Sequence, residues 1–306
     1  MKATWQANSE LVDSVIPKII DFNVALTRLY YSPNSNGDYL CINNKNAVIR
    51  TDTNQYLGIV GDRYNPIQNR DFFNFFTNVC DISKLKISNA GIVGNGSKIW
   101  LSTKLPETIK LKNVDELKYY ILFINSHDGS TAMNICITPI RVACENTLMI
   151  ATRKAVRNIK IMHTKNYNEK IHMANSILNI AYEYVSETSK TFEYLSNIKL
   201  SDKEAYMLLL NTVSPDPVKN VDEVSKRTLN VVDYMMNILH SNVGGMDMET
   251  TKGTAFGVFN ALAYYYDHIK YSDSSGKDGF EPILFGHVNE KRNNLINLVK
   301  QSEHVI

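Results

Sequence analysis

Two runs rich in apolar and β-branched residues, joined by an Asp-Gly turn, constrain the fold of this chain more than any other feature. The run KYYILFIN ends at residue 125, TAMNICITPIR begins at residue 131, and SHDGS connects them. Asp-Gly is among the strongest short-range signals for a β-hairpin, because both residues tolerate the backbone conformation of a tight turn. We therefore predict two adjoining antiparallel strands that meet across Asp128-Gly129.

The residues before this hairpin carry further signals for strands, turns and helices. YLCI and AVIRT flank NNKN (43–46), a second pair of runs flanks GNGS (94–97), and YLGIVGDRY (56–64) follows a strand pattern. Residues 1–30 have apolar residues near helical spacing, and SPNSNGD (32–38) is a turn-rich break. NRDFFNFFTNVC predicts a helix that buries several phenylalanines, with Asn69 as its N-cap.

After residue 145 the pattern changes to helical periodicity. NTLMIATRKAVRNIKI (146–161) is the first predicted helix, further helical runs extend to residue 300, and SDKE (201–204) has the Ser and Glu of a capping box. The predicted fold class is therefore α+β. We expect a hairpin-rich antiparallel sheet with packed helices in residues 1–145, and a mostly helical region in residues 146–306 that packs on it as one extended unit.

The composition of the 306 residues matters mainly for what it excludes. The net charge is only +2, so any surface that binds nucleic acid must be local. The four cysteines have no CxxC spacing, and the first residues lack the apolar core of a signal peptide. No apolar run approaches the roughly 20 residues needed to span a bilayer. We expect a cytoplasmic protein with reduced thiols and no contact with a membrane.

Few residues suggest a metal site or a catalytic centre. The candidate metal ligands are His127 with Asp128, His163, His172, and Asp267 with His268. None of them forms an HExxH pattern or joins a CxxC pair, and the chain has no GxSxG, P-loop or GxGxxG motif. Cys144 lies between a predicted strand and a predicted helix, where the helix dipole can lower the pKa of a thiol. A buried small residue is the more ordinary interpretation of Cys144, so we expect no metal, no cofactor and no enzymatic activity.

The segment 141–170 is unusually basic for a chain of nearly balanced charge. It contains seven Lys or Arg residues and two Glu residues. Arg153, Lys154 and Arg157 can share one face of a helix, and contacts from such side chains to phosphates give sequence-independent affinity for nucleic acid. Tyr and Phe side chains in the strands can add stacking platforms for single-stranded bases. A solvated surface helix explains the same composition without a ligand.

Four segments resemble the phage and plasmid proteins grouped as the domain of unknown function DUF932. They are GIVGDRYNPIQNRDFFNF, the hairpin containing GSKIWLSTKLP, YYILFINSHDGSTAMNICITPIRVACENTL, and GTAFGVFNALAYYYDH with the later LFG. The most specific part is the order of HDGS (127–130), TPIR (138–141) and CENTL (144–148). The resemblance covers about residues 55–290. It implies a context of phage genomes and mobile elements and little established chemistry.

A helix, a meander of antiparallel hairpins and then a basic helix are also similar to the core of Rad52-like single-strand annealing proteins. This similarity implies that the hairpins and the helix after the sheet line a positively charged groove on an oligomeric ring. It implies no use of ATP. The residues expected to contact nucleic acid are Arg141, Arg153, Lys154, Arg157, Lys160 and Lys165.

The remaining motif residues are interpreted as a scaffold for these cations. His127, Asp128 and Gly129 belong to the hairpin turn, and Pro139 ends the second strand or lies at its edge. Asn146 is expected to cap the helix that carries the basic residues.

The sequence thus predicts an ATP-independent nucleic-acid-binding protein of phage or plasmid recombination, which binds and anneals single-stranded DNA. We also expect a homo-oligomer, and the similarity to annealing proteins implies that the oligomer is a ring. The alternative is a phage protein that inhibits a host defence system by binding a host or phage protein. A third interpretation is an unrecognised enzyme that uses Cys144, His127 and Asp128.

Overall fold

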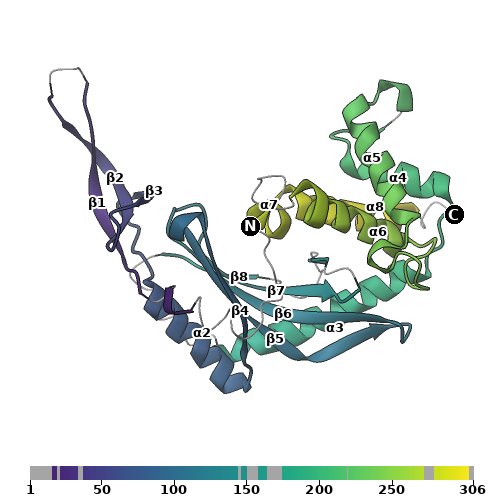
Figure 1. The fold of residues 1–306 in the computed structure, drawn as a ribbon, viewed down its shortest axis with the longest axis horizontal. Coiled ribbons are helices and arrows are strands. Elements are labelled where there is room, and N and C mark those ends of the chain that lie inside the picture. The colour runs from purple at the N-terminus through teal and green to yellow at the C-terminus, as the bar shows by residue number, and fades with distance from the viewer. Residues whose placement is uncertain are drawn as a thin grey trace.

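The computed structural model describes residues 16–18, 21–33, 37–143, 146–149, 158–163, 174–218, 220–271 and 279–302. The strands are β1 (Val24–Tyr31), β2 (Leu40–Arg50), β3 (Tyr56–Gly61), β4 (Ile87–Val93), β5 (Lys98–Leu111), β6 (Asp115–Ser126), β7 (Met133–Arg141) and β8 (Asn158–Ile161). The helices are α2 (Asn69–Ser83), α3 (Ala174–Asn197), α4 (Asp202–Val213), α5 (Lys226–Leu239), α6 (Ala255–Tyr264), the π-helix η5 (Tyr265–Lys270), α7 (Phe280–Leu284) and α8 (His287–Ser302). The chain therefore has the predicted α+β fold, with antiparallel sheets and a helical C-terminal half (Figure 1).

The main sheet is an antiparallel meander in the order β4-β5-β6-β7-β8. Its central hairpin is the one predicted from the Asp-Gly turn: β6 pairs with β7 from Ile124↔Asn134 to Leu117↔Arg141, and Gly129 has a φ of 74°. β8 pairs only with residues 133–136 of β7. Pro139 lies within β7 opposite Tyr119 of β6, and on its other side its carbonyl oxygen accepts a hydrogen bond from Leu148 N at 2.8 Å, so it does not lie at an open edge of the sheet.

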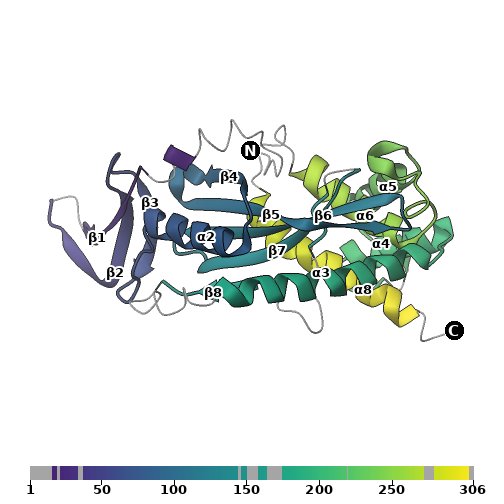
Figure 2. The ribbon, with the colours of Figure 1, turned by 90° about the horizontal axis from the view of Figure 1, so that it is seen from below.

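The helices α2 and α3 cover one face of this sheet (Figure 2). The rings of Phe75 and Phe76 in α2 meet Phe123 of β6 at centroid distances of 5.9 and 4.9 Å. The hydroxyl of Tyr119 lies 2.9 Å from that of Thr188 in α3. The amphipathic pattern of the α2 sequence thus predicts both the helix and the side that it buries.

The opposite face lies below α6, α7 and α8 (Figure 1). It carries a smaller apolar cluster that includes Trp100 and Leu122 and is completed by Met149 and by Leu284 of α7. Residues 255–263 of α6 are all buried, and Phe192 of α3 packs on two of its phenylalanines. The larger hydrophobic core runs from α2 and α3 along their face of the sheet to α6 and α8, and β8 from the second half of the chain completes the sheet of the first.

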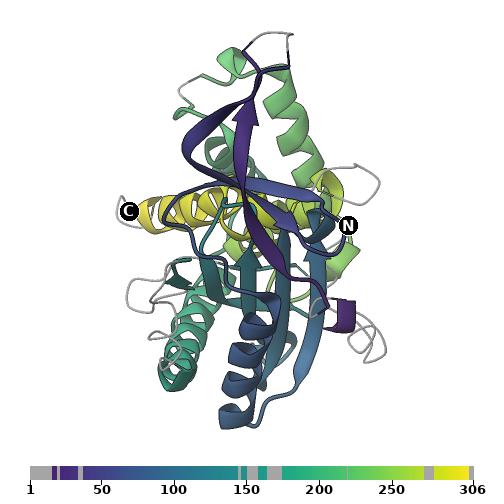
Figure 3. The ribbon, with the colours of Figure 1, turned by 90° about the vertical axis from the view of Figure 1, so that its left-hand side faces the viewer.

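The three-stranded sheet β1-β2-β3 forms an arm that extends away from the rest of the molecule (Figures 1 and 3). Arg50 holds its base: the guanidinium donates to Asn95 O at 2.8 Å, pairs with Asp52 at 2.6 Å and lies 3.9 Å from the centre of the Phe22 ring. On the other side of the arm, Gly58 lies so close to the Asp128 backbone that a Cβ atom has no room there. The arm is therefore fixed at its base.

Several local predictions were wrong. Residues 24–31 form strand β1 and not part of a helix, and NNKN lies in an irregularity within the single strand β2, where Asn44 has a φ of 61°. The connection between β1 and β2 is not NNKN but residues 32–39, which include the SPNSNGD segment. The N-cap of α2 is Gln68, and Asn69 is the first helical residue. Residues 158–161, predicted as helix, form β8 because they pair with β7.

Other predictions are confirmed. Ser201 and Glu204 form the capping box at the start of α4, and α5, α6 and α8 lie in the predicted helical runs. Within the described ranges, no helix combines the length and apolarity that crossing a membrane requires.

We expect Gly58→Ala to lower the free energy of unfolding by about 1–3 kcal/mol, because the added methyl group forces β3 away from the backbone of the 126–132 turn. Gly61→Ala in the same strand is the matched control, since its Cβ meets nothing within 4 Å, and it should change stability by less than about 0.5 kcal/mol. Urea unfolding of both variants measures the difference. Equal stability of the two would contradict the close approach of β3 to the turn.

Candidate functional site

The turn between β6 and β7 is held by the carboxylate of Asp128. This carboxylate accepts hydrogen bonds from Ser126 Oγ at 2.6 Å and from the Ser130 backbone N at 2.9 Å, and it pairs with Lys98 Nζ at 2.8 Å. Partial burial by itself raises the pKa of Asp128, but these hydrogen bonds outweigh burial and lower that pKa to about 2. Asp128 is therefore an anionic turn residue whose partners lie within the chain.

His127 points the other way, into the core between the sheet and the start of α2. Its Nε2 lies 2.6 Å from Asn69 Oδ1, and since Asn69 donates its amide to Phe22 O, the histidine nitrogen is the donor. His163 follows β8, stacks on Tyr64 at 4.8 Å and accepts a hydrogen bond from Ile67 N at its Nδ1. Both rings are thus fixed as neutral imidazoles by contacts within the fold.

Burial keeps both histidines neutral. Desolvation, with a smaller contribution from the charge of His163, lowers the pKa of His127 to about 3, although Asp128 opposes the shift. Desolvation alone lowers the pKa of His163 to about 4. In the part of the chain that the structure describes, no three His, Cys, Asp or Glu side chains are grouped closely enough to hold a metal ion. The two rings therefore act as packing and hydrogen-bonding groups.

A cavity of about 500 Å³ opens beside this turn, between the segment after β3 and the segment after β8. Its lining includes Asp62, Arg63, Ser130, Thr131 and His163. One cation beside one anion gives it no net charge with which to favour a phosphate. The described residues of its lining supply hydroxyl groups, but they do not include the set of cations that a nucleic-acid strand requires.

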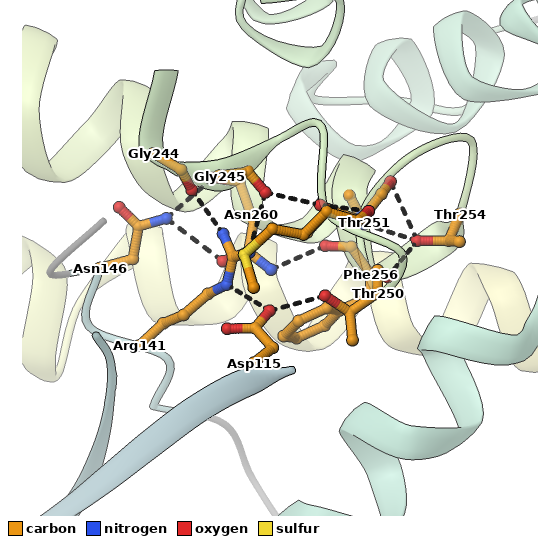
Figure 4. A network of polar contacts seen from close by, with 12 residues as sticks. Asp115, Arg141, Asn146, Gly244, Gly245, Thr250, Thr251, Thr254, Phe256 and Asn260 are labelled. Atoms are coloured by element: carbon orange, nitrogen blue, oxygen red, sulfur yellow. Dashed lines mark hydrogen bonds and ion pairs between the residues drawn. The ribbon is translucent and has the colours of Figure 1, made fainter. Parts of the chain in front are cut away.

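Arg141 lies at the end of β7 and is completely buried (Figure 4). Its Nε donates to Asp115 Oδ2 at 2.7 Å, and its two terminal nitrogens donate to the carbonyl oxygens of Gly244 and Gly245 at 2.7 and 3.0 Å. Thr250 Oγ1 donates to the same carboxylate oxygen at 2.7 Å. The expectation that Arg141 contacts nucleic acid is therefore corrected, because its guanidinium is not exposed to solvent and is used within the fold.

A second polar cluster lies next to the first. Asn146 donates its amide to Asn260 O at 3.1 Å, and its Oδ1 lies 3.2 Å from His268 Nε2. The carboxylate of Asp267 accepts hydrogen bonds from Thr147 N and from Arg292, both at 2.7 Å. Asn146 therefore binds α6 and η5, and its side-chain oxygen is not used to cap a following helix.

Three lysines of the sheet lie on its α7 side. Residues directly opposite one another in antiparallel strands share a face, and side chains alternate with a period of two. Trp100, Ile124, Asn134 and Lys160 form one cross-strand row, Lys104 pairs with Tyr120, and Lys118 pairs with Ile140. Lys104, Lys118 and Lys160 consequently project from one face of the sheet. None of the three forms an ion pair with a described residue.

The basic segment expected to bind nucleic acid is only partly described. Lys160 is exposed and lies on strand β8, which corrects its placement on a helix. Arg153, Lys154, Arg157 and Lys165, as well as Cys144 and His172, lie outside the described residues. The two described ends of segment 150–157 are both at the lysine-bearing face, since Met149 belongs to the apolar cluster there and Asn158 begins β8.

The family model of DUF932, a domain of unknown function, matches residues 56–294 of the chain. The protein belongs to the DUF932 family. The match begins at β3 and ends in α8, so that β1 and β2 of the arm precede it. A search of curated proteins and a search of solved structures found no match. The similarity to Rad52-like annealing proteins therefore stays a prediction.

The segments by which the sequence resembles DUF932 proteins meet at the two polar clusters. Arg141 comes from TPIR, Asn146 and Thr147 come from CENTL, and Asn260 and Asp267 come from the α6–η5 segment. Every one of these groups bonds another part of the same chain. In this DUF932 protein, these motif residues join the end of the sheet to the helical half.

Sequence reasoning missed the partners of these motif residues. Asp115, Thr250 and Arg292 complete the two clusters, and Gly244 and Gly245 present their carbonyl groups to Arg141. The sequence signal for this contact was the pair Gly244-Gly245. Both residues adopt a positive φ, of 60° and 67°, which glycine tolerates better than other residues. Asn69 also has a role other than the expected one, as the partner of His127.

We expect Arg141→Met to lower the free energy of unfolding by about 3–5 kcal/mol, because it leaves the Asp115 carboxylate buried without a cation. Asp115→Asn combined with Arg141→Met should cost less than the sum of the two single changes, since it removes both charges. Lys112→Met is the control, as its ion pair with Glu249 is 3.9 Å long and its hydrogen bond to Ser196 O is only partly buried, and it should cost about 1 kcal/mol. Additive losses in denaturant titrations would contradict coupling of the pair.

We expect the protein to lose stability as the pH falls from about 6.5 toward 3. Well above pH 6.5, His127 and His163 are neutral in both the folded and the unfolded chain. Below pH 6.5 the unfolded chain binds protons at these histidines and the folded protein does not. This difference persists until the pH reaches the folded pKa values, about 3 for His127 and about 4 for His163. At about 1.4 kcal/mol per pH unit, each histidine lowers the free energy of unfolding by about 2 kcal/mol at pH 5 relative to pH 7. Urea unfolding at the two pH values measures this loss.

His163→Gln should remove a large part of this pH dependence, because glutamine keeps an acceptor for Ile67 N and does not titrate. His240→Gln is the matched control, since His240 is exposed. If His163→Gln has the same dependence on pH as the wild-type protein, the assignment of the effect to the buried histidine is wrong.

Proposed function

We propose that the protein binds single-stranded nucleic acid without ATP, in phage or plasmid recombination. The observation that carries the proposal is that three lysines project from the α7 side of the sheet. Lys104, Lys118 and Lys160 come from three different strands, and they project from the same face. A chain with a net charge of only +2 thus places three cations on one face of its sheet, and a phosphate-binding surface in such a chain has to be local.

The described residues that precede and follow the basic segment 150–157 support the same surface. Met149 and Asn158, the described residues on either side of it, both lie at the lysine-bearing face. Arg153, Lys154 and Arg157 are therefore tethered within a few residues of Lys160. Of the seven cations in residues 141–170, Arg141 is buried and Lys160 is already one of the strand lysines. The other five are added to the strand lysines, against two anions in the same segment.

The buried aromatic residues of this face define what kind of binding is proposed. Trp100 and Tyr120 are only 5% and 7% exposed, so they do not offer open rings on which bases can stack. The proposed contacts are therefore to phosphates, and affinity should arise from counterion release. Binding of this kind is largely independent of base sequence.

A second candidate function is the binding of a host or phage protein, as in inhibition of a host defence system. The observation that favours it is the exposed apolar surface of the arm, where Tyr30, Tyr31, Tyr39 and Leu40 are each about half exposed or more. Apolar residues gathered on a projecting element are typical of protein-binding surfaces.

We expect labelled single-stranded DNA to bind the protein at low salt and to be released steeply as salt rises. The triple variant Lys104→Ala, Lys118→Ala and Lys160→Ala should lower the slope of log K against log salt by about 0.7 for each phosphate that a lysine no longer neutralises. The triple variant Arg153→Ala, Lys154→Ala and Arg157→Ala should lower it in the same way. Fluorescence anisotropy titrations at several salt concentrations, with duplex DNA in parallel, measure these slopes.

The matched control is Lys190→Ala, Lys203→Ala and Lys226→Ala, which removes the same charge from exposed positions on α3, α4 and α5. It should leave the slope unchanged. If the control weakens binding as much as the strand-lysine variant, the affinity is due to net charge and not to this face. If the wild-type protein does not bind DNA at low salt, the protein-binding function is the better account.

A further inference from the structure

Three buried polar atoms near the start of α2 have no hydrogen-bond partner among the described residues. They are Asn125 Oδ1, His127 Nδ1 and His163 Nε2. The three side chains are 0%, 0% and 5% exposed, so bulk water does not reach these atoms. A polar group that is buried without a hydrogen bond is costly, and in native proteins it often indicates an ordered water molecule.

The segment that precedes α2 brings the three side chains together. His163 Nδ1 accepts a hydrogen bond from Ile67 N at 3.3 Å, and the amide nitrogen of Asn125 donates to Ile67 O at 2.9 Å. Two residues further along the chain, Asn69 accepts the hydrogen bond from His127 at 2.6 Å. Side chains from β6, from the turn after β6 and from the segment after β8 therefore all contact residues 67–69.

Asn125 and His127 project from the same face of the main sheet. The ladder between β5 and β6 continues beyond the end of β6, because His127 N donates to Ser97 O at 2.7 Å. Side chains alternate along a strand, so positions 125 and 127 share the face of Phe123, which packs on α2. The charge of His163 contributes to the lowered pKa of His127, as expected for two rings that lie near each other.

The hydrogen bonds of these side chains decide which of the three atoms carries a proton. His163 is neutral and accepts from Ile67 N at Nδ1, so its Nε2 is an N–H donor. His127 donates from Nε2 to Asn69, so its Nδ1 is an acceptor. Asn125 donates its amide nitrogen to Ile67 O, which makes its Oδ1 a second acceptor. The site thus presents one donor and two acceptors.

This set of groups distinguishes between the possible occupants. A metal ion would need an unprotonated nitrogen on each imidazole, and the proton on His163 Nε2 prevents this. An ammonium ion has no acceptor for that proton. A direct hydrogen bond between the two rings would leave Asn125 Oδ1 unpaired. A water molecule has two O–H donors and an oxygen that accepts, so it alone among these satisfies all three atoms.

We propose that this site binds one buried water molecule, which accepts a hydrogen bond from His163 Nε2 and donates to His127 Nδ1 and Asn125 Oδ1. Buried waters typically make about three hydrogen bonds to polar groups of this kind. His163 and Tyr64 also line the cavity beside the turn, so solvent reaches the outer side of the site. Water can therefore enter from this cavity.

The water molecule joins three parts of the fold. Gln68 makes two hydrogen bonds to the backbone of Val24 at the base of β1, each 3.0 Å long. His163 follows β8, the strand that carries Lys160, and Asn125 belongs to the central strand β6. The water thus helps to fix the base of the arm and the end of β8 against the main sheet. This role is independent of nucleic-acid binding.

The test is NMR spectroscopy of the full-length protein that carries isotope-labelled histidine in a deuterated background. Long-range nitrogen–proton spectra should show both buried rings neutral, with the proton on Nε2. The Nε2 proton of His163 should have a rotating-frame cross-peak to water with the sign of a dipolar contact and not of proton exchange. A scalar coupling between His163 Nε2 and His127 Nδ1 would overturn the proposal, because it shows a direct hydrogen bond between the rings. The absence of a dipolar contact with water would also overturn it, as would exchange of this proton as fast as in the exposed His240.

The variant His127→Gln tests the part that His127 takes. The glutamine amide nitrogen can replace the donor to Asn69, whereas the acceptor at Nδ1 is removed. With one hydrogen bond fewer holding the water, the His163 Nε2 proton should exchange with solvent roughly fivefold to tenfold faster. His240→Gln is the matched control and should leave this rate unchanged, since His240 is exposed. An unchanged rate in His127→Gln would show that His127 does not bind the water, and the proposal would be wrong. If this variant does not fold, the wild-type spectra decide.

Discussion

The buried ion pair between Asp115 and Arg141 is the interaction on which the joining of the two halves depends. Both side chains are fully buried, at the start of β6 and the end of β7, which are adjacent in the main sheet. Two charges are costly to remove from water unless their hydrogen-bonding capacity is used, and here Thr250 and the carbonyl groups of Gly244 and Gly245 use much of it. The segment that precedes α6 is therefore held against one end of the sheet.

The second cluster extends this joint toward α8. Asp267 links the backbone of Thr147 to Arg292, and it lies in the π-helical segment η5 that continues α6. A π-helical turn is rare and is often found at functional positions. In this chain it coincides with the point where Asp267 and His268 reach the loop after β7, so its geometry serves the contact between sheet and helices.

The covering of the sheet on both faces limits where a partner can bind. α2 and α3 occupy one face, and the apolar cluster below α7 occupies much of the other, so that broad aromatic surfaces are not exposed there. Among the described residues, two surfaces have a clear chemical character: the lysines of β5, β6 and β8, which suit an anionic polymer, and the arm, which is nearly neutral and apolar. The two surfaces differ enough in charge to serve different partners.

The sequence by itself determined the elements whose signals are local. The Asp-Gly hairpin, the amphipathic α2 and the capping box at Ser201 follow from turn chemistry, periodicity and capping, which act within a few residues. Only the tertiary structure decided that residues 24–31 and 158–161 are strands, because their conformation depends on pairing with β2 and β7. It also decided the role of Arg141, since its partners are 26 and more than 100 positions away. An arginine in a basic segment looks like a surface cation until the fold brings a carboxylate and two carbonyl groups to it and removes the water.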